Sequence, residues 1–548
     1  MSLRWWTPPR RIGPVPGLAL GLALMLSTGL EVRPASAQTV EYPAGFDEEG
    51  RLYPAALGPL SRPITTSSER AQAFFDQGLQ MMYAFTPLRA ARSFRQAQVE
   101  DPDCAMCYWA EAWAWGPYLN GGMGPDDAPR AYENIEKAVK LAGDASNVER
   151  ALIEAMAVRY APEQDETSRR KMDSTYAQAM AGVYERYPED LEAGTLYAES
   201  LMLLEPRRGR WDIDNPDVQL IHRVLEETLA RDITHPGACH LYVHATEPTE
   251  APEKASDCAA YLGNSIPGAS HIQHMPSHTY NRIGRWGESV RGNLAAWHSD
   301  LKAEIGEGFA IYPSHNLHML LFAASMDGQG AIATQAAKDY AKIVPGGSFY
   351  RVLTLLRFGR FDEILELDDP PEGAIQRGFW DFGRGYAYLR EDEDMGRARV
   401  YLERVQDAAA ETPDSESFRG HTAASLLGVV GAILEGEILR AEGDLSGAIV
   451  ALEAAAELED GLRYDEPEPL NFSVRHWLGD ALLEAERYGE AEAVFELALE
   501  DHPHNGWSLF GLEEALRAQG RDAEADQVHE AFEAAWARSD TWIRGPVF

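Results

Sequence analysis

One set of spacings occurs at two distant places in the chain and constrains its fold more than any single motif. The same four gaps of 12, 4, 3 and 5 positions separate Gly78, Ala90, Phe94, Ala97 and Pro102, and again Gly479, Ala491, Phe495, Ala498 and Pro503. Residues about three or four positions apart share one face of a helix, and a proline favours the end of a helix. The spacing therefore predicts pairs of helices repeated along the chain, and an elongated all-α array rather than one compact core.

This pattern resembles the tetratricopeptide repeat (TPR), in which a small residue marks the first helix and a small-aromatic-small pattern marks the second. The same gaps continue through the middle of the chain at Val243, Ala255, Ala259, Leu262 and Pro267, and at Leu321, Ala333, Ala337, Tyr340 and Pro345. The resemblance implies a TPR-like α-solenoid, a right-handed superhelix of helix-turn-helix repeats. We expect a lead-in, three groups of repeats and a tail, at residues 38–64, 65–230, 231–346, 347–538 and 539–548.

The N-terminus has the pattern of a secretory signal. Arginines at positions 4, 10 and 11 precede an apolar run at 18–26 and the sequence Ala-Ser-Ala at 35–37. We expect cleavage near Ala37 and a periplasmic or secreted protein, by either the general or the twin-arginine route. No later apolar run has the length of a membrane span. The formal charge of −38 disfavours nucleic acids and anionic membrane surfaces as partners.

Seven histidines fall at equivalent positions of three consecutive central repeats. If the small residue in the first helix is position eight, they occupy positions two, five and nine. The resemblance implies that these positions line the concave groove of the solenoid. We therefore expect one wall of imidazoles in the groove, built by His240, His244, His271, His274, His278, His315 and His318.

The spacing of these histidines is typical of metal ligands, because residues three or four apart on a helix can reach one ion. Nitrogen ligands favour copper first and zinc second over magnesium or calcium. Two sets of three histidines would resemble coupled dicopper centres in ligand count. Glu247, one turn after His244, is a candidate metal ligand, orienting group or catalytic general base.

Two classes of function fit this pattern. The first is a metal protein, either a copper- or zinc-dependent enzyme (an oxidoreductase or a hydrolase) or a metal-handling protein. The second is a scaffold without catalysis, whose groove binds a peptide or protein partner with the histidines as contacts.

The four cysteines allow two disulfides in an exported chain. Cys104 and Cys107 form a C-x-x-C motif that fits a structural disulfide, a redox-active dithiol or a metal site, with Asp103 expected to cap the following helix. Cys239 and Cys258 fall on the two antiparallel helices of one repeat. They could form a disulfide between these helices or remain buried free thiols.

Several strings are similar to a family of exported bacterial TPR proteins with histidine-rich and C-x-x-C motifs. That family has no settled activity, so the resemblance implies an architecture and not a reaction. The strings span residues 235–244, 274–278, 315–318, 103–109 and 464–467.

Overall fold

The computed structural model describes residues 40–46, 48–206 and 209–548, and nearly all of their regular structure is helical. The predicted signal at residues 1–37 lies outside the described residues. No helix within the described ranges is long and apolar enough to cross a membrane.

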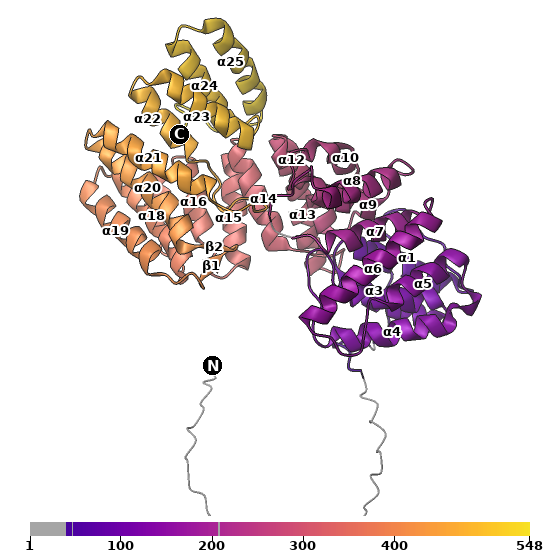
Figure 1. Cartoon of the computed structure of the whole chain (residues 1–548). Helices are drawn as coiled ribbons and strands as arrows, with labels where there is room; N and C mark the ends of the chain where they lie inside the picture. The colour runs from indigo at the N-terminus through magenta and orange to yellow at the C-terminus, as the bar shows by residue number, and fades with distance from the viewer. Residues whose placement is uncertain (1–39, 47, 207–208) are drawn as a thin grey trace, which may run out of the picture. The chain divides into compact units, whose positions relative to one another are not determined.

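The helices follow one another along the whole described chain (Figure 1). The N-terminal ones are α1 Glu69–Tyr83, α2 Pro87–Glu100, α3 Ala105–Ala114, α4 Asp127–Leu141, η1 Ala142–Asp144, α5 Asn147–Ala157, α6 Glu166–Arg186, α7 Leu191–Met202 and α8 Pro216–Leu229. The central ones are α9 Pro236–Thr246, η2 Pro252–Ala255, α10 Ser256–Leu262, α11 Ser270–His274, α12 Pro276–Arg282, α13 Trp286–Glu304, α14 Pro313–Met326 and α15 Gly330–Ile343.

The C-terminal helices are interrupted once, by a short antiparallel pair of strands between α19 and α20. The elements are α16 Phe349–Arg357, α17 Phe361–Glu366, α18 Ala374–Arg390, α19 Met395–Glu411, β1 Ser417–Phe418, β2 His421–Thr422, α20 Ala423–Ala441, α21 Leu445–Asp460, α22 Arg475–Glu484, α23 Tyr488–Asp501, α24 Gly506–Ala518 and α25 Asp522–Trp536.

Consecutive helices pack against each other in pairs, most extensively α1 with α2, α18 with α19 and α20 with α21 (Figure 1). The packing explains the spacing found in the sequence. A Cβ atom at Gly78 would lie 2.4 Å from the Phe94 ring, and one at Gly479 would lie 2.3 Å from the Phe495 ring. Only a small residue lets the aromatic side chain of the second helix approach the first so closely. The protein is an all-α, TPR-like solenoid.

Two hydrophobic cores divide the chain, one running from Phe46 to Ile311 and the other from Trp286 to Val547. The central repeats contribute to both. This places the histidine-rich helices α9, α11, α12 and α14 where the two cores meet.

Both irregular ends are packed against helices. The Gln77 and Gln80 side chains accept hydrogen bonds from the backbone of Tyr53 and Gly58 in the lead-in, at 2.9 and 2.7 Å. In the tail, the Asp540 carboxylate accepts from the backbone N–H of Gly330 at the start of α15 (2.6 Å). The described part of the lead-in around Tyr53 and Gly58, and the tail, are therefore parts of the folded unit.

Candidate metal centre

The structure brings six of the seven predicted histidines together in two adjoining groups. Each histidine of a group contributes one ring nitrogen, and the three nitrogens all lie within 4.8 Å of one another. The groups are His240, His244 and His271, named here the first set, and His274, His278 and His315, named the second set. The sequence predicted that all seven histidines would lie together, without saying how they would group.

The histidines do not line an open groove. Side chains of both sets are buried, with 0–4% exposure for all members except the half-buried His315. Phe85 covers the first set, because its ring lies 4.1 Å from that of His240 and stacks on those of His244 and His271. Tyr312 meets His271 edge-on at 5.0 Å. The resemblance implied a groove wall, whereas the structure has an interior site closed by aromatic rings.

In the first set, His240 and His244 lie one helical turn apart on α9, and His271 comes from α11. The ring centres of His244 and His271 are 4.9 and 5.0 Å from that of His240. The Nδ1–H of His240 donates to the carbonyl of Tyr83 at 2.6 Å. Because a carbonyl can only accept, this bond leaves the Nε2 lone pair for another partner.

In the second set, the Nε2 atoms of His274 and His278 lie 2.8 Å apart. The His315 ring, from the first turn of α14, lies 4.5 Å from that of His274. The Nδ1 of His274 meets the Asn293 side-chain oxygen at 2.6 Å. Since the Asn293 amide donates to the Ser289 carbonyl at 2.9 Å, its oxygen faces the imidazole. His274 therefore carries its proton on Nδ1.

Glu247 orients His278 in the same way. Its carboxylate accepts from the Nδ1 of His278 at 2.8 Å, and its side chain is buried. This contact is the geometry that the second of the three roles proposed for Glu247, an orienting group, would require. Sequence alone gave no means of choosing among the roles.

The two sets adjoin along two edges. The His244 ring lies 5.5 Å from His278, and the His271 ring lies 5.6 Å from His274. Glu247 and Glu466 lie at the junction, where their carboxylates and a His244 nitrogen are within 4.8 Å of one another. Ions held by the two sets would therefore be neighbours.

The electrostatic environment favours neutral imidazole, which is the form that binds metal. Burial lowers the pKa of His274 and His315 well below the usual value, and neighbouring histidines lower it further.

His318 lies outside both sets. Its Nε2 is 2.6 Å from the Tyr350 hydroxyl, which also lies 3.0 Å from the carbonyl oxygen of Pro469. The hydrogen bond with Tyr350 occupies the Nε2 of His318, so this nitrogen is not available to a metal. The structure gives this histidine a packing role instead.

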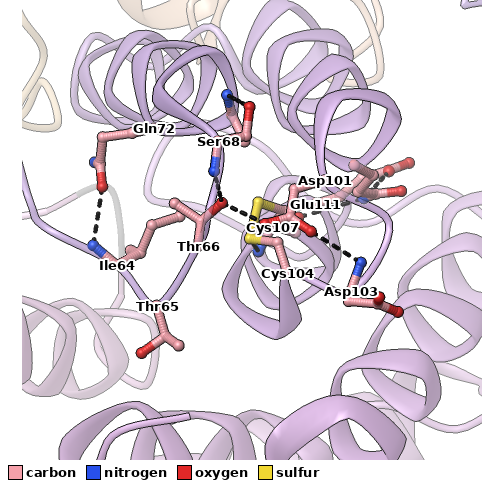
Figure 2. Close-up of a disulfide and its surroundings, with 12 residues drawn as sticks. Ile64, Thr65, Thr66, Ser68, Gln72, Asp101, Asp103, Cys104, Cys107 and Glu111 are labelled. Atoms are coloured by element: carbon pink, nitrogen blue, oxygen red, sulfur yellow. Dashed lines mark hydrogen bonds between the residues drawn. A yellow bond between two sulfur atoms is a disulfide. The ribbon is translucent and has the colours of Figure 1, made fainter. Parts of the chain in front are cut away.

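The Cys104–Cys107 disulfide lies at the start of α3, with Asp101, Thr66 and Glu111 around it (Figure 2). Cys104, rather than the expected Asp103, caps the helix by accepting from the backbone N–H of Cys107. Both sulfurs are buried, with 1% and 0% exposure of the residues. Thiol–disulfide exchange needs access to a sulfur, so this burial favours the structural interpretation.

The second disulfide joins Cys239 to Cys258. It links α9, which carries His240 and His244, to α10. Of the two alternatives considered for this pair, the structure has the disulfide. The bridge fixes a ligand-bearing helix to its partner.

Asp300, on α13, anchors the start of α14, which carries His315. Its carboxylate accepts from the Asn316 amide at 2.8 Å and from the backbone N–H of Ile311 at 3.3 Å. Burial raises the pKa of Asp300 to about 6, which these hydrogen bonds only partly offset.

Stability of the metal-free protein should depend on pH through Asp300. Because its folded pKa is raised, its contribution to stability is fully present below about pH 4 and is lost as the pH rises through 6. Relative to the Asp300→Asn variant, the wild type should lose about 2–3 kcal/mol of unfolding free energy between pH 4 and 7. Urea unfolding with chelator at both pH values measures this difference. A difference that is independent of pH contradicts the assignment.

Four residues of the centre were not predicted as parts of it from the sequence: Phe85, Asn293, Tyr312 and Glu466. Phe85 and Tyr312 have φ angles of 57° and 55°, in the left-handed region that non-glycine residues rarely adopt. The spacing of residues in the repeats does not indicate which non-glycine residues adopt a left-handed backbone conformation. Glu466 belongs to the string at 464–467 noted for its family resemblance, which was the only available indication.

No family model matches the chain, and a search of curated proteins finds no match. Solved structures with similarity include Naa15/Naa10 bound to HypK, with 14% identity, a TM-score of 0.22 and coverage of 85% of this chain and 75% of that one. Yeast Tom70 has 15% identity, a TM-score of 0.27 and coverage of 86% and 92%. The TPR domain of P58(IPK) has 12% identity, a TM-score of 0.21 and coverage of 82% and 98%. With TM-scores this low the likenesses carry no argument about function, which has to be argued from the site.

Proposed function

We propose that this protein is an exported metalloprotein that holds a pair of transition-metal ions in the two histidine sets, with copper favoured and zinc second. The observation that carries the proposal is the 2.8 Å approach of the His274 and His278 Nε2 atoms. Asn293 and Glu247 accept from the Nδ1 atoms of these histidines, so two neutral rings would direct lone pairs at each other. Such an arrangement repels unless a cation lies at the nitrogens.

A proton on His278, balanced by Glu247, could bridge one pair of nitrogens. One proton cannot bridge all three imidazoles of the second set, because a hydrogen bond joins only one pair of nitrogens. A metal ion accepts lone pairs from three histidines at once. The chemistry of the donor set therefore fits a metal better than a proton.

The number and burial of the histidines also help to choose between a metal-dependent enzyme and a metal-handling protein. Three histidines leave the fourth position of a tetrahedral ion open, as in catalytic sites. Buried ligands hinder the rapid exchange that a metal carrier needs. We therefore place a metal-dependent enzyme, an oxidoreductase or a hydrolase, ahead of metal handling. Glu247, which contacts His278, supports catalysis by orienting that imidazole.

Export rests on the signal-like sequence before residue 38, and the two disulfides suit an oxidising compartment. A peptide or protein partner in the groove of the solenoid is a separate proposal. The buried histidines cannot serve an extended peptide as contacts.

The proposal is tested by measuring the metal content of protein purified without a histidine tag after export with copper and zinc supplied. We expect about two equivalents of copper or zinc per chain, one for each set. Elemental analysis after gel filtration gives this number. Protein without stoichiometric transition metal, even after reconstitution, would show that a proton bridges the nitrogens.

A further inference from the structure

A segment far along the chain brings a second carboxylate to the histidine sets. Glu466 lies between α21 and α22, and its carboxylate is 3.9 Å from the Nδ1 of His278. It also belongs to the group in which ligand atoms of His244, Glu247 and Glu466 lie within 4.8 Å of one another. It therefore faces one histidine from each set.

The position of Glu466 is fixed by contacts that do not involve the histidines. The Arg419 guanidinium, beside β1 and β2, pairs with the neighbouring Asp465 at 2.7 Å. It also donates to the backbone carbonyls of Glu466 and Pro467, at 2.8 and 3.3 Å. These bonds hold the backbone of the segment in place before any ion binds, as a preorganised ligand requires.

The two carboxylates at the junction have different geometry. Glu247 is within hydrogen-bond distance of the His278 Nδ1, at 2.8 Å, and so acts on the far side of that ring from its Nε2. Glu466 is 3.9 Å from the same atom, which is too long for a hydrogen bond. Both carboxylates lie within 4.8 Å of one His244 nitrogen, so Glu466 reaches the edge of the first set without the short contact that Glu247 makes with His278.

We propose that Glu466 is a metal ligand at the junction of the two histidine sets, an inference that rests on the proposed function. Six neutral imidazoles bring no charge to offset two cations, and buried charges need compensation. A carboxylate at the junction supplies negative charge and can bind through one or both oxygens. The C-terminal repeats therefore complete a centre whose histidines all come from the central repeats.

If Glu466 binds an ion, the first effect should be seen in the segment that carries it. Metal binding should protect the backbone of residues 463–468, because a ligand in this segment becomes fixed to the ion. Hydrogen exchange of the wild-type protein with and without Cu(II) or Zn(II) measures this effect. We expect slower exchange in the segment with metal, and unchanged exchange there would overturn the inference.

The second test compares Glu466→Gln with Glu468→Gln. Both variants remove one carboxylate from the same segment without changing its size. Glu468 pairs with His502 at 3.5 Å and belongs to none of the three candidate ligand groups. Affinities for Cu(II) and Zn(II) are measured by competition with a chelator, after circular dichroism has established that each apo variant is folded.

We expect Glu466→Gln to weaken binding of at least one ion by about tenfold or more, and Glu468→Gln to stay within about twofold of the wild type. Wild-type affinity in Glu466→Gln would overturn the ligand role and leave the histidine centre intact. Failure of the wild type to take up metal would overturn both proposals. Should Glu466→Gln not fold, the hydrogen-exchange experiment on the wild type decides the question.

Discussion

Replacing His274 and His278 together with alanine should lower the metal content of the protein from about two equivalents per chain to about one. The double variant leaves His315 as the sole histidine of the second set, and one imidazole cannot hold an ion in competition with buffer and chelator. The first set keeps all three of its histidines. Elemental analysis of the untagged variant measures the loss.

The same logic applies to the first set. A His240→Ala plus His244→Ala variant should also retain about one equivalent, and the combination of all four substitutions should retain none. The matched control is His222→Ala plus His476→Ala, which removes two buried imidazoles outside both sets. If the control loses as much metal, the loss in the other variants comes from damage to the fold and not from removal of ligands.

His315 and His318 provide a second large contrast, because the sequence treats them alike and the structure does not. His315→Ala should remove about one equivalent of metal. His318→Ala should retain both, because the Nε2 of His318 is hydrogen-bonded to Tyr350 and holds no ion. The cost of His318→Ala should appear in stability, by about 2–4 kcal/mol, from the cavity and the lost partner of a buried hydroxyl.

Elemental analysis and urea unfolding of the metal-free proteins separate these two outcomes. Loss of metal in His318→Ala without loss in His315→Ala would reverse the assignment of the two residues. Equal loss in both would mean that the ion also contacts His318, in the second turn of α14, which the second set as described does not include.

Sequence spacing predicted much of the fold because the spacing has a local cause. The ring of Phe94 packs where Gly78 lacks a side chain, and Phe495 does the same at Gly479. Contacts of this kind depend on residues within one repeat, so they can be read from the chain. The alignment of the repeats then predicted that the six histidines of the two sets lie on the first helices of neighbouring repeats. In the structure they lie close together.

The remainder depends on contacts between distant segments. His318 is withdrawn from the site by Tyr350 of the next repeat, and Phe85 closes the groove through an unusual backbone angle. Glu466 reaches the centre through Arg419, which belongs to a hairpin inserted between repeats. None of these contacts follows from helical periodicity, which describes one element at a time.

The central claim, that the two histidine sets hold two neighbouring ions, is tested most directly by anomalous scattering from crystals grown with Cu(II) and measured at the copper edge. We predict two peaks in the protein interior, one among the ring nitrogens of His240, His244 and His271 and the other among those of His274, His278 and His315. Crystals that show no peak at either set, with the His274 and His278 nitrogens still in contact, would contradict the account.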